Sequence, residues 1–217
     1  INWFNITGLT DDIAINRMLE DFGFDSIDGK DVLTPNHVVK IDDYSDHVII
    51  VMGSCFLGEK EKIHSEHICI LAKKNLILTF SERDNSLFGH IENVLQKNVM
   101  GIRNKKSGML LAFLLNAVFS QLIETALYIE EKLERLEKLL LSTDPERPVI
   151  GSREIQQARH ANLIIRRNTF PLKEEFNKLQ KEQTGVIDKS MVRVFTELSD
   201  QLEYIIQTSE NSREILD

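Results

Sequence analysis

The stretch that most constrains the fold of this chain is its last one, residues 186–217. Its apolar residues recur at heptad positions and give way to serines near the end: Met191, Phe195, Leu198, Leu202 and Ile205, then Ser209 and Ser212. This spacing is typical of the seam of a coiled-coil-like helix. The stretch contains no glycine or proline that would end the helix. We therefore expect a long helix that continues past Asp217, as part of a longer protein.

Two further long helical patterns precede this stretch, at residues 106–141 and 153–182. Residues 142–152 between them hold two prolines and a glycine, which predicts a turn between antiparallel helices. The first pattern begins apolar and ends charged, so its early part should be buried and its later part should project into solvent. Together the three helices carry more apolar surface than one chain is expected to cover, which favours a homo-oligomer.

The first hundred residues have a different character, with short β-branched runs separated by turn residues. Strands are expected at residues 1–6, 38–41, 47–57, 63–72 and 76–81, and helices at 11–22, 26–33 and 87–98. The predicted fold class is α+β, a mixed sheet flanked by helices and followed by three long helices. The predicted domains are residues 1–101, 102–182 and 183–217.

The charge distribution limits the partners of the chain. The formal net charge is −8, and residues 1–100 hold 9 basic against 16 acidic side chains. An acidic first half favours cations over phosphate groups and argues against a nucleic-acid surface, which needs a basic stripe. Cys55 and Cys69 lie in apolar runs and are expected to be buried, reduced thiols.

No arrangement of residues typical of catalysis is visible. The sequence has no glycine-rich phosphate loop and no Cys-x-x-Cys motif, and nothing selects one pair among its many carboxylates. His64 and His67 would point to opposite faces of a strand, so they do not predict a zinc site. The remaining histidines, His37, His47, His90 and His160, are expected at the surface or in packing roles. We therefore expect that the chain is not an enzyme.

A succession of short motifs is similar to one known family. These motifs are WFNITGL at residues 3–9, FGF at 22–24, DVL at 31–33, VKIDDY at 39–44 and HVIIV at 47–51, followed by residues 65–68, 74–75 and 166–176. In this order and spacing they resemble the cytoplasmic domain of the CorA-type magnesium transporters. The resemblance covers essentially the whole chain.

The resemblance implies an α/β funnel domain, an antiparallel helix pair and a stalk helix that leads into the membrane. Five copies of such a protein would surround a central pore, and this domain would lie at the cytoplasmic face of the bacterial inner membrane. The pore signature of the family, Gly-Met-Asn, would lie beyond residue 217. The membrane would thus be reached through a C-terminal segment outside this sequence.

The resemblance also implies a regulatory cation site between neighbouring copies. Asp31 matches its first ligand, and Glu197, with Asp200 one turn on, matches the stalk acid. The sequence departs from the family at Lys30, where an acid is usual, and at Asn116, where other members carry an acid. Few carboxylates and retained waters suit a weak Mg²⁺ site, with Co²⁺, Ni²⁺ and Zn²⁺ as alternatives. From the residues alone, Asp31 also fits a capping acid, and the two stalk acids fit a hydrated helix flank.

The expected function is therefore the regulatory and gating domain of a CorA-type Mg²⁺ channel that senses intracellular Mg²⁺ between subunits. One alternative is the corresponding domain of a ZntB-like zinc transporter. Another, of a different class, is a soluble coiled-coil scaffold.

Overall fold

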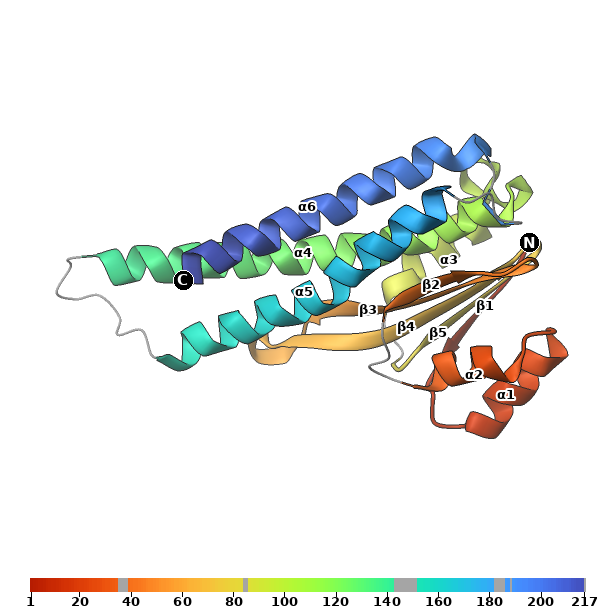
Figure 1. Ribbon diagram of the computed structural model, residues 1–217, viewed down its shortest axis with the longest axis horizontal. Helices are drawn as coiled ribbons and strands as arrows, with labels where there is room; N and C mark the ends of the chain where they lie inside the picture. The colour runs from red at the N-terminus through yellow and green to blue at the C-terminus, as the bar shows by residue number, and fades with distance from the viewer. Residues whose placement is uncertain (35–38, 84–85, 143–151, 182–185, 188, 217) are drawn as a thin grey trace.

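The computed structural model describes residues 1–34, 39–83, 86–142, 152–181, 186–187 and 189–216. These residues form a sheet of five strands: β1 (Asn2–Thr7), β2 (Lys40–Asp43), β3 (His47–Leu57), β4 (Ile63–Lys73) and β5 (Leu76–Ser81). The α-helices are α1 (Asp12–Asp21), α2 (Ser26–Leu33), α3 (Gly89–Gln96), α4 (Ser107–Leu141), α5 (Ser152–Lys181) and α6 (Val192–Leu216). The predicted α+β class, a mixed sheet followed by three long helices, is confirmed (Figure 1).

The strand order in the sheet is β1-β5-β4-β3-β2. Strands β2 to β5 form an antiparallel meander, with register pairs such as Ile50 with Ile70 and Leu71 with Leu78. The short connection at Lys73 confirms the hairpin predicted between residues 72 and 76. Strand β1 lies parallel to β5 at the edge of the sheet, so the chain start returns to the end of the meander.

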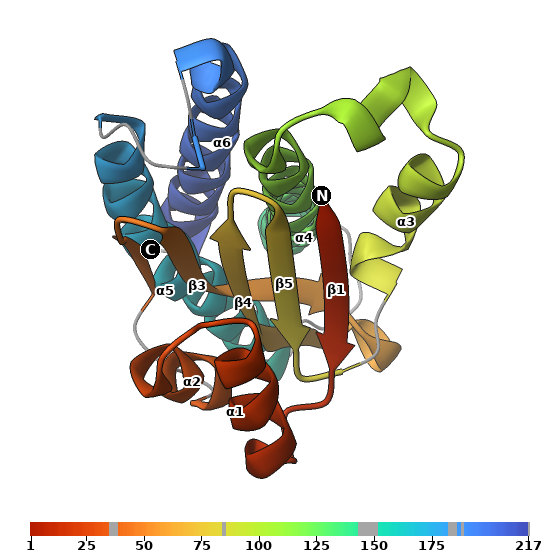
Figure 2. The same ribbon diagram turned by 90° about the vertical axis from the view of Figure 1, so that its right-hand side faces the viewer.

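Alternate residues of the central strands pack into two separate hydrophobic cores, one on each face of the sheet. Ile49 and Val51 of β3 pack with α1 and α2, whereas Val48 and Ile50 of the same strand pack with α4. This alternation follows from the two-residue period of a strand. Because both faces are covered, β3 reads as a continuous apolar run rather than an alternating one. Figure 2 shows α1 and α2 on one side of the sheet and α4, α5 and α6 on the other.

The three long helices pack against one another within the same chain. Helix α6 contacts α4 and α5 along its length, as Figure 1 shows. The seven seam residues named above, from Met191 just before α6 to Ser212, are at most 3% exposed. The burial of Leu216, which the heptad pattern also places on the seam, lies outside the described side chains. One chain thus covers this seam, but other large apolar residues of the three helices stay exposed: Phe113, Leu127, Leu140, Leu141, Leu163 and Val192. The homo-oligomer stays a prediction. The heptad seam is the inner face of an intramolecular three-helix layer, so it is no argument for an oligomer.

Helix α4 is the central element of the larger core. By length and composition it is the one helix among the described residues that could cross a membrane, with a mean hydropathy of 1.7 over its most apolar window. However, 56% of that window is buried inside the protein, as in the core helix of a globular domain. Burial continues as far as Leu133, and Leu141 is exposed. The predicted solvent-exposed part is thus confined to the last turns.

Helix α5 runs through Pro171 without interruption. The predicted turn at residues 142–152 falls outside the described residues, apart from Ser142 and Ser152 at the two helix ends. Cys55 and Cys69 are free and fully buried, as predicted.

Candidate cation site

Helix α2 is held in place by its own first residues. The Asp25 side chain accepts hydrogen bonds from the backbone N–H groups of Ile27 and Asp28, and Asp28 Oδ2 accepts from the Asp25 N–H in return. This reciprocal capping box satisfies N–H groups that a helix start leaves without partners. The helix therefore begins at a fixed residue, and Asp31 lies about one turn further along, on the face that packs against the sheet.

Asp31 is nearly buried, at 5% exposed, and an internal cation neutralises it. Lys40 Nζ lies 2.6 Å from Asp31 Oδ2 and 2.8 Å from Asp42 Oδ2. Burial lowers the pKa of the Lys40 ammonium, but its hydrogen bonds to Asp31 and Asp42 outweigh that effect and raise the pKa well above its usual range. Lys40 thus stays charged at any physiological pH, and a metal ion at Asp31 must compete with it.

A second pair of acids flanks His47 beside this cluster. His47 Nδ1 lies 2.9 Å from Asp46 Oδ1, and His47 Nε2 lies 3.3 Å from Asp28 Oδ1. The imidazole stacks on Tyr44 at a centroid distance of 4.7 Å and is 8% exposed as a residue. His47 is therefore a packing residue, as predicted, but it also lies between two carboxylates. The interaction with His47 lowers the pKa of the exposed Asp46 carboxyl.

Lys40, Asp42, Asp28 and His47 were not selected from the sequence. Two signals were present, because the motif VKIDDY contains both Lys40 and Asp42, and a histidine follows an acid at the start of β3. Neither signal indicates which residues of α2 those side chains meet. That pairing depends on how α2 docks on β3 and β4, which is a long-range feature of the fold.

Glu197 and Asp200 lie on α6 and are exposed, as the heptad register predicts for positions outside the seam. Glu197 borders a groove of about 350 Å³ between α4 and α6, together with Asn116. Asn116 Oδ1 accepts a hydrogen bond of 2.8 Å from Gln201 Nε2. Asn116, where the family resemblance implies an acid, therefore forms a hydrogen bond between the two helices.

The structure does not bring Asp31 together with Glu197 and Asp200 in one chain. Helix α2 covers one face of the sheet, and α6 lies beyond α4 and α5 on the other (Figures 1 and 2). Within the part of the chain that the structure describes, no group of three or more His, Cys, Asp or Glu side chains could hold a metal ion. A site that uses these three acids thus requires two copies of the chain.

His64 and His67 point to opposite faces of β4, as predicted. His67 Nε2 lies 3.2 Å from the Val32 carbonyl oxygen on the α2 side. His64 stacks on Phe56 and lines a cavity between β4, α4 and α5. They do not form a joint metal site.

Comparison with known proteins gives a consistent result. The cobalt/magnesium transport protein CorA of Thermotoga maritima is 25% identical over 217 residues, which are 99% of this chain and 60% of that protein. This chain therefore spans less than two thirds of that relative.

Two solved structures share the fold. The soluble domain of CorA from Methanocaldococcus jannaschii matches with a TM-score of 0.78 at 20% identity, over 99% of this chain and 84% of that one. The cytoplasmic domain of ZntB from Vibrio parahaemolyticus matches with a TM-score of 0.78 at 15% identity, over 99% of this chain and 82% of that one. A family model described as "CorA-like Mg2+ transporter protein" matches residues 1–217. Because this match extends over the whole sequence, the chain belongs to the family of CorA-like Mg²⁺ transporter proteins.

Proposed function

We propose that this chain is the cytoplasmic regulatory and gating domain of a CorA-type divalent-cation channel at the bacterial inner membrane. The observation that carries the proposal is the family match over all 217 residues. The whole protein would reach the membrane through a segment beyond these residues and would assemble as a pentamer. The ion would be Mg²⁺ in the first place, and Co²⁺ is also named for the relative from Thermotoga maritima.

The proposed sensor site joins Asp31 of one copy to Glu197 and Asp200 of its neighbour. The exposure of the two stalk acids supports this arrangement, because another copy can approach them. Asp31 is paired with Lys40, whose side chain is 22% exposed. Solvent therefore reaches the partner of Asp31, although Asp31 itself is nearly buried. Mg²⁺ keeps much of its water shell, so a bridging ion need not displace every protein contact.

The proposed mechanism is a population shift. A cation between two copies reduces the repulsion between their carboxylates and favours the closed, symmetric ring. When intracellular Mg²⁺ falls, the ion leaves, the copies tilt relative to one another, and the pore opens. The coupling depends on the difference in ion affinity between the two states, and not on the affinity itself.

The test uses the full-length protein in liposomes, with limited proteolysis at rising Mg²⁺ concentration. Mg²⁺ should protect the wild type, and Glu197→Gln combined with Asp200→Asn should shift the protection to higher concentration. Glu210→Gln, an exposed acid of the same helix, is the matched control and should leave the midpoint unchanged. Equal midpoints for all three proteins would refute the sensor site, while flux through the liposomes would still test the transporter itself.

A second candidate is the corresponding domain of a zinc transporter, because the ZntB cytoplasmic domain has the same fold. The fold does not distinguish the two ions. Parallel measurements of Mg²⁺ and Zn²⁺ flux in the same liposomes decide between them. Zn²⁺ flux without Mg²⁺ flux would favour the zinc transporter.

A further inference from the structure

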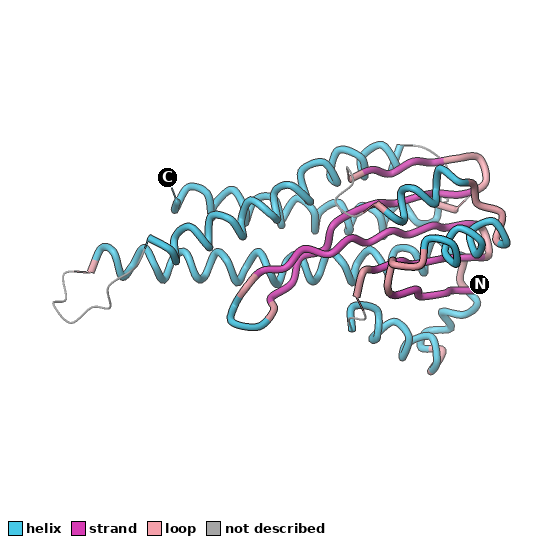
Figure 3. Tube along the Cα trace, turned by 90° about the horizontal axis from the view of Figure 1, so that it is seen from below, coloured by secondary structure: helices cyan, strands magenta, loops and turns pink. Residues whose placement is uncertain are grey.

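A cavity separate from the acidic cluster lies near the tip of the β3–β4 hairpin. These two strands are 11 residues each and extend beyond the rest of the sheet (Figure 3). The cavity has a volume of about 470 Å³ and opens between the start of β4, the middle of α4 and the first half of α5. That volume lies within the range of about 300–1,000 Å³ that is usual for small-molecule sites.

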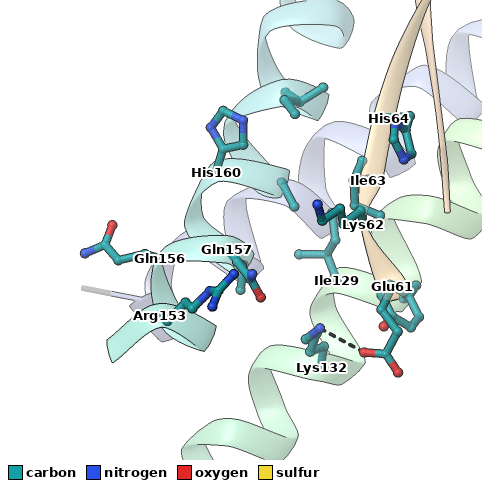
Figure 4. Close-up of a pocket in the computed structure, with 14 residues that line it drawn as sticks. Glu61, Lys62, Ile63, His64, Ile129, Lys132, Arg153, Gln156, Gln157 and His160 are labelled. Carbon is teal, nitrogen blue, oxygen red and sulfur yellow. Dashed lines mark hydrogen bonds and ion pairs between the residues drawn. The ribbon is translucent and has the colours of Figure 1, made fainter. Parts of the chain in front are cut away.

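The rim of this cavity is cationic, although the chain as a whole is acidic. Lys62, which directly precedes β4, Lys132 from α4 and Arg153 from α5 all line it, and Glu61 is the one acid among its lining residues. Figure 4 shows Arg153 and Lys132 reaching into the same space from their two helices. Although the net charge of the chain is −8, these three basic side chains make the surroundings of the cavity locally positive.

Glu61 neutralises one of these three charges. Its Oε2 lies 3.0 Å from Lys132 Nζ, drawn as a dashed line in Figure 4. Contact with the Tyr128 hydroxyl and with the Lys132 ammonium lowers the pKa of the Glu61 carboxyl. Glu61 also adopts a φ of 56°, in the left-handed region that is unusual for a residue other than glycine. Such strain persists only where surrounding contacts fix it.

The cavity retains two positive charges, on Lys62 and Arg153. Both side chains are exposed, and within the described residues neither has a carboxylate in salt-bridge range. His64, His160 and Gln157 add hydrogen-bonding groups around them. An arginine presents a planar fork of N–H donors that matches phosphate or carboxylate oxygens in pairs. The rim is therefore suited to a ligand that carries a phosphate.

The floor of the cavity is apolar. Ile129 of α4 is 1% exposed, and Ala158 and Ala161 of α5 are 3% and 8% exposed. Ile63 and Ile164 complete this surface. An inorganic anion would leave the apolar part uncovered, whereas a flat organic body would cover it. A floor of this kind below a charged rim is the usual composition of a site for an organic anion.

We propose that this cavity binds a small soluble organic phosphate with an aromatic or apolar body, of the class of nucleoside monophosphates. The phosphate lies between Lys62 and Arg153, and the body covers Ile129 and the two alanines of α5. The site is separate from the proposed cation sensor, because Asp31 lies across the sheet from it. It also lies on α5, the helix against which α6 packs.

Isothermal titration of the chain with AMP tests the proposal, with adenosine and inorganic phosphate as parallel probes. AMP should bind at least about tenfold more tightly than either probe, because adenosine lacks the phosphate and inorganic phosphate lacks the apolar body. Lys62→Ala and Arg153→Ala should each weaken AMP binding about tenfold or more, as expected for the loss of one charge-assisted contact. Lys138→Ala, an exposed lysine of α4 outside the cavity, is the matched control and should have no effect.

A gain-of-binding variant separates recognition from misfolding. Glu61→Gln removes the carboxylate that pairs with Lys132. The ammonium of Lys132 is then free to attract the phosphate, so AMP should bind several-fold more tightly. Absence of AMP binding up to about 10 mM, a binding free energy weaker than about −3 kcal/mol, would overturn the proposal. So would equal affinity for AMP and either probe, or equal effects of Lys62→Ala and Lys138→Ala. Vesicles of phosphatidylglycerol that bind through Lys62 and Arg153 while AMP does not would assign the surface to a membrane instead.

Discussion

Replacement of Lys40 by methionine is the most direct test of the acidic cluster on α2 and β2. Lys40 is the cation between Asp31 and Asp42, at 2.6 and 2.8 Å. Methionine keeps an unbranched side chain of similar length, so the packing of the aliphatic stem changes little. The substitution therefore removes the ammonium and leaves a carboxylate that is 5% exposed without its neutralising charge.

The expected loss follows from the burial of the pair. Removal of one partner of a buried ion pair costs about 3–5 kcal/mol, because the other charge stays buried. The Lys40 side chain is 22% exposed and the Asp42 side chain 40% exposed, so water reaches part of the cluster. We therefore expect the lower end, a loss of about 3 kcal/mol in the free energy of unfolding.

Urea denaturation at pH 7 measures this loss. The double variant Lys40→Met with Asp31→Asn should recover part of the loss, because it removes the buried charge as well. Lys138→Met is the control, since Lys138 forms an exposed pair with Glu134 at 3.4 Å that should contribute less than about 0.5 kcal/mol. A Lys40→Met loss no larger than that of the control, or a double variant no more stable than the single one, would refute the reasoning.

Mg²⁺ provides a second measurement on the same variant. Without the ammonium, Asp31 and Asp42 are two adjacent carboxylates that a divalent cation can neutralise. At ten times its dissociation constant, an ion that binds the folded state alone stabilises it by about 1.4 kcal/mol. Mg²⁺ should therefore stabilise Lys40→Met more than the wild type. Equal stabilisation of both proteins would mean that Lys40 does not compete with the ion.

Three further predictions concern buried or half-buried groups. Burial and the neighbouring acid raise the pKa of Tyr128 to about 12, so the folded state favours the neutral phenol. This contribution to stability is complete below about pH 10 and is lost as the pH rises towards 12. In an absorbance titration, the component that ionises last should be absent from Tyr128→Phe. Asn162→Ala removes a donor to the Ser209 carbonyl and an acceptor for its hydroxyl at 3.0 and 2.6 Å, and urea denaturation should show a loss of about 1–3 kcal/mol that is smaller when Ser209 is also replaced by alanine. Burial raises the pKa of the Cys55 thiol to about 11 and that of Cys69 further, so a thiol reagent at pH 8 should label neither until urea unfolds the chain; labelling of the native protein would contradict this.

The antiparallel strands of residues 1–100 could be predicted because the signals for their hairpins are local. The turn cluster before His47 and the short connection after Lys73 fix two antiparallel hairpins, and both lie where the sequence places them. The bounds of β3 and β5 are those predicted, and the bounds of the other three strands differ by at most two residues. The parallel position of β1 beside β5 could not be predicted in the same way, because no local signal indicates which strand a first strand joins. Membership of a transporter family agrees with the prediction that the chain is not an enzyme.

The long helices show the limit of a periodic pattern. A heptad repeat indicates that a helix has one apolar stripe, but it does not indicate which part of the protein, or which partner, covers that stripe. The repeat predicts a coiled-coil-like seam on α6, and α4 and α5 of the same chain cover it. The two serines at the end of the seam belong to the same interface, since Ser209 bonds Asn162 of α5. Polar residues in a seam can therefore mark a buried hydrogen bond as well as the end of an apolar contact.

The positions of the three predicted ligands limit how a cation sensor could work in this chain. Asp31 lies on the α2 side of the sheet, and Glu197 and Asp200 lie on α6, beyond α4 and α5. The packed core between them leaves no path for one ion to contact both sets within a copy. Any ion that uses all three acids must therefore bind at a contact between copies, and its affinity is linked to their association. Within each copy Lys40 already neutralises Asp31, so the free energy gained by the ion has to come largely from the acids of α6. A sensor built in this way responds weakly to the ion in one chain and strongly in an assembled ring.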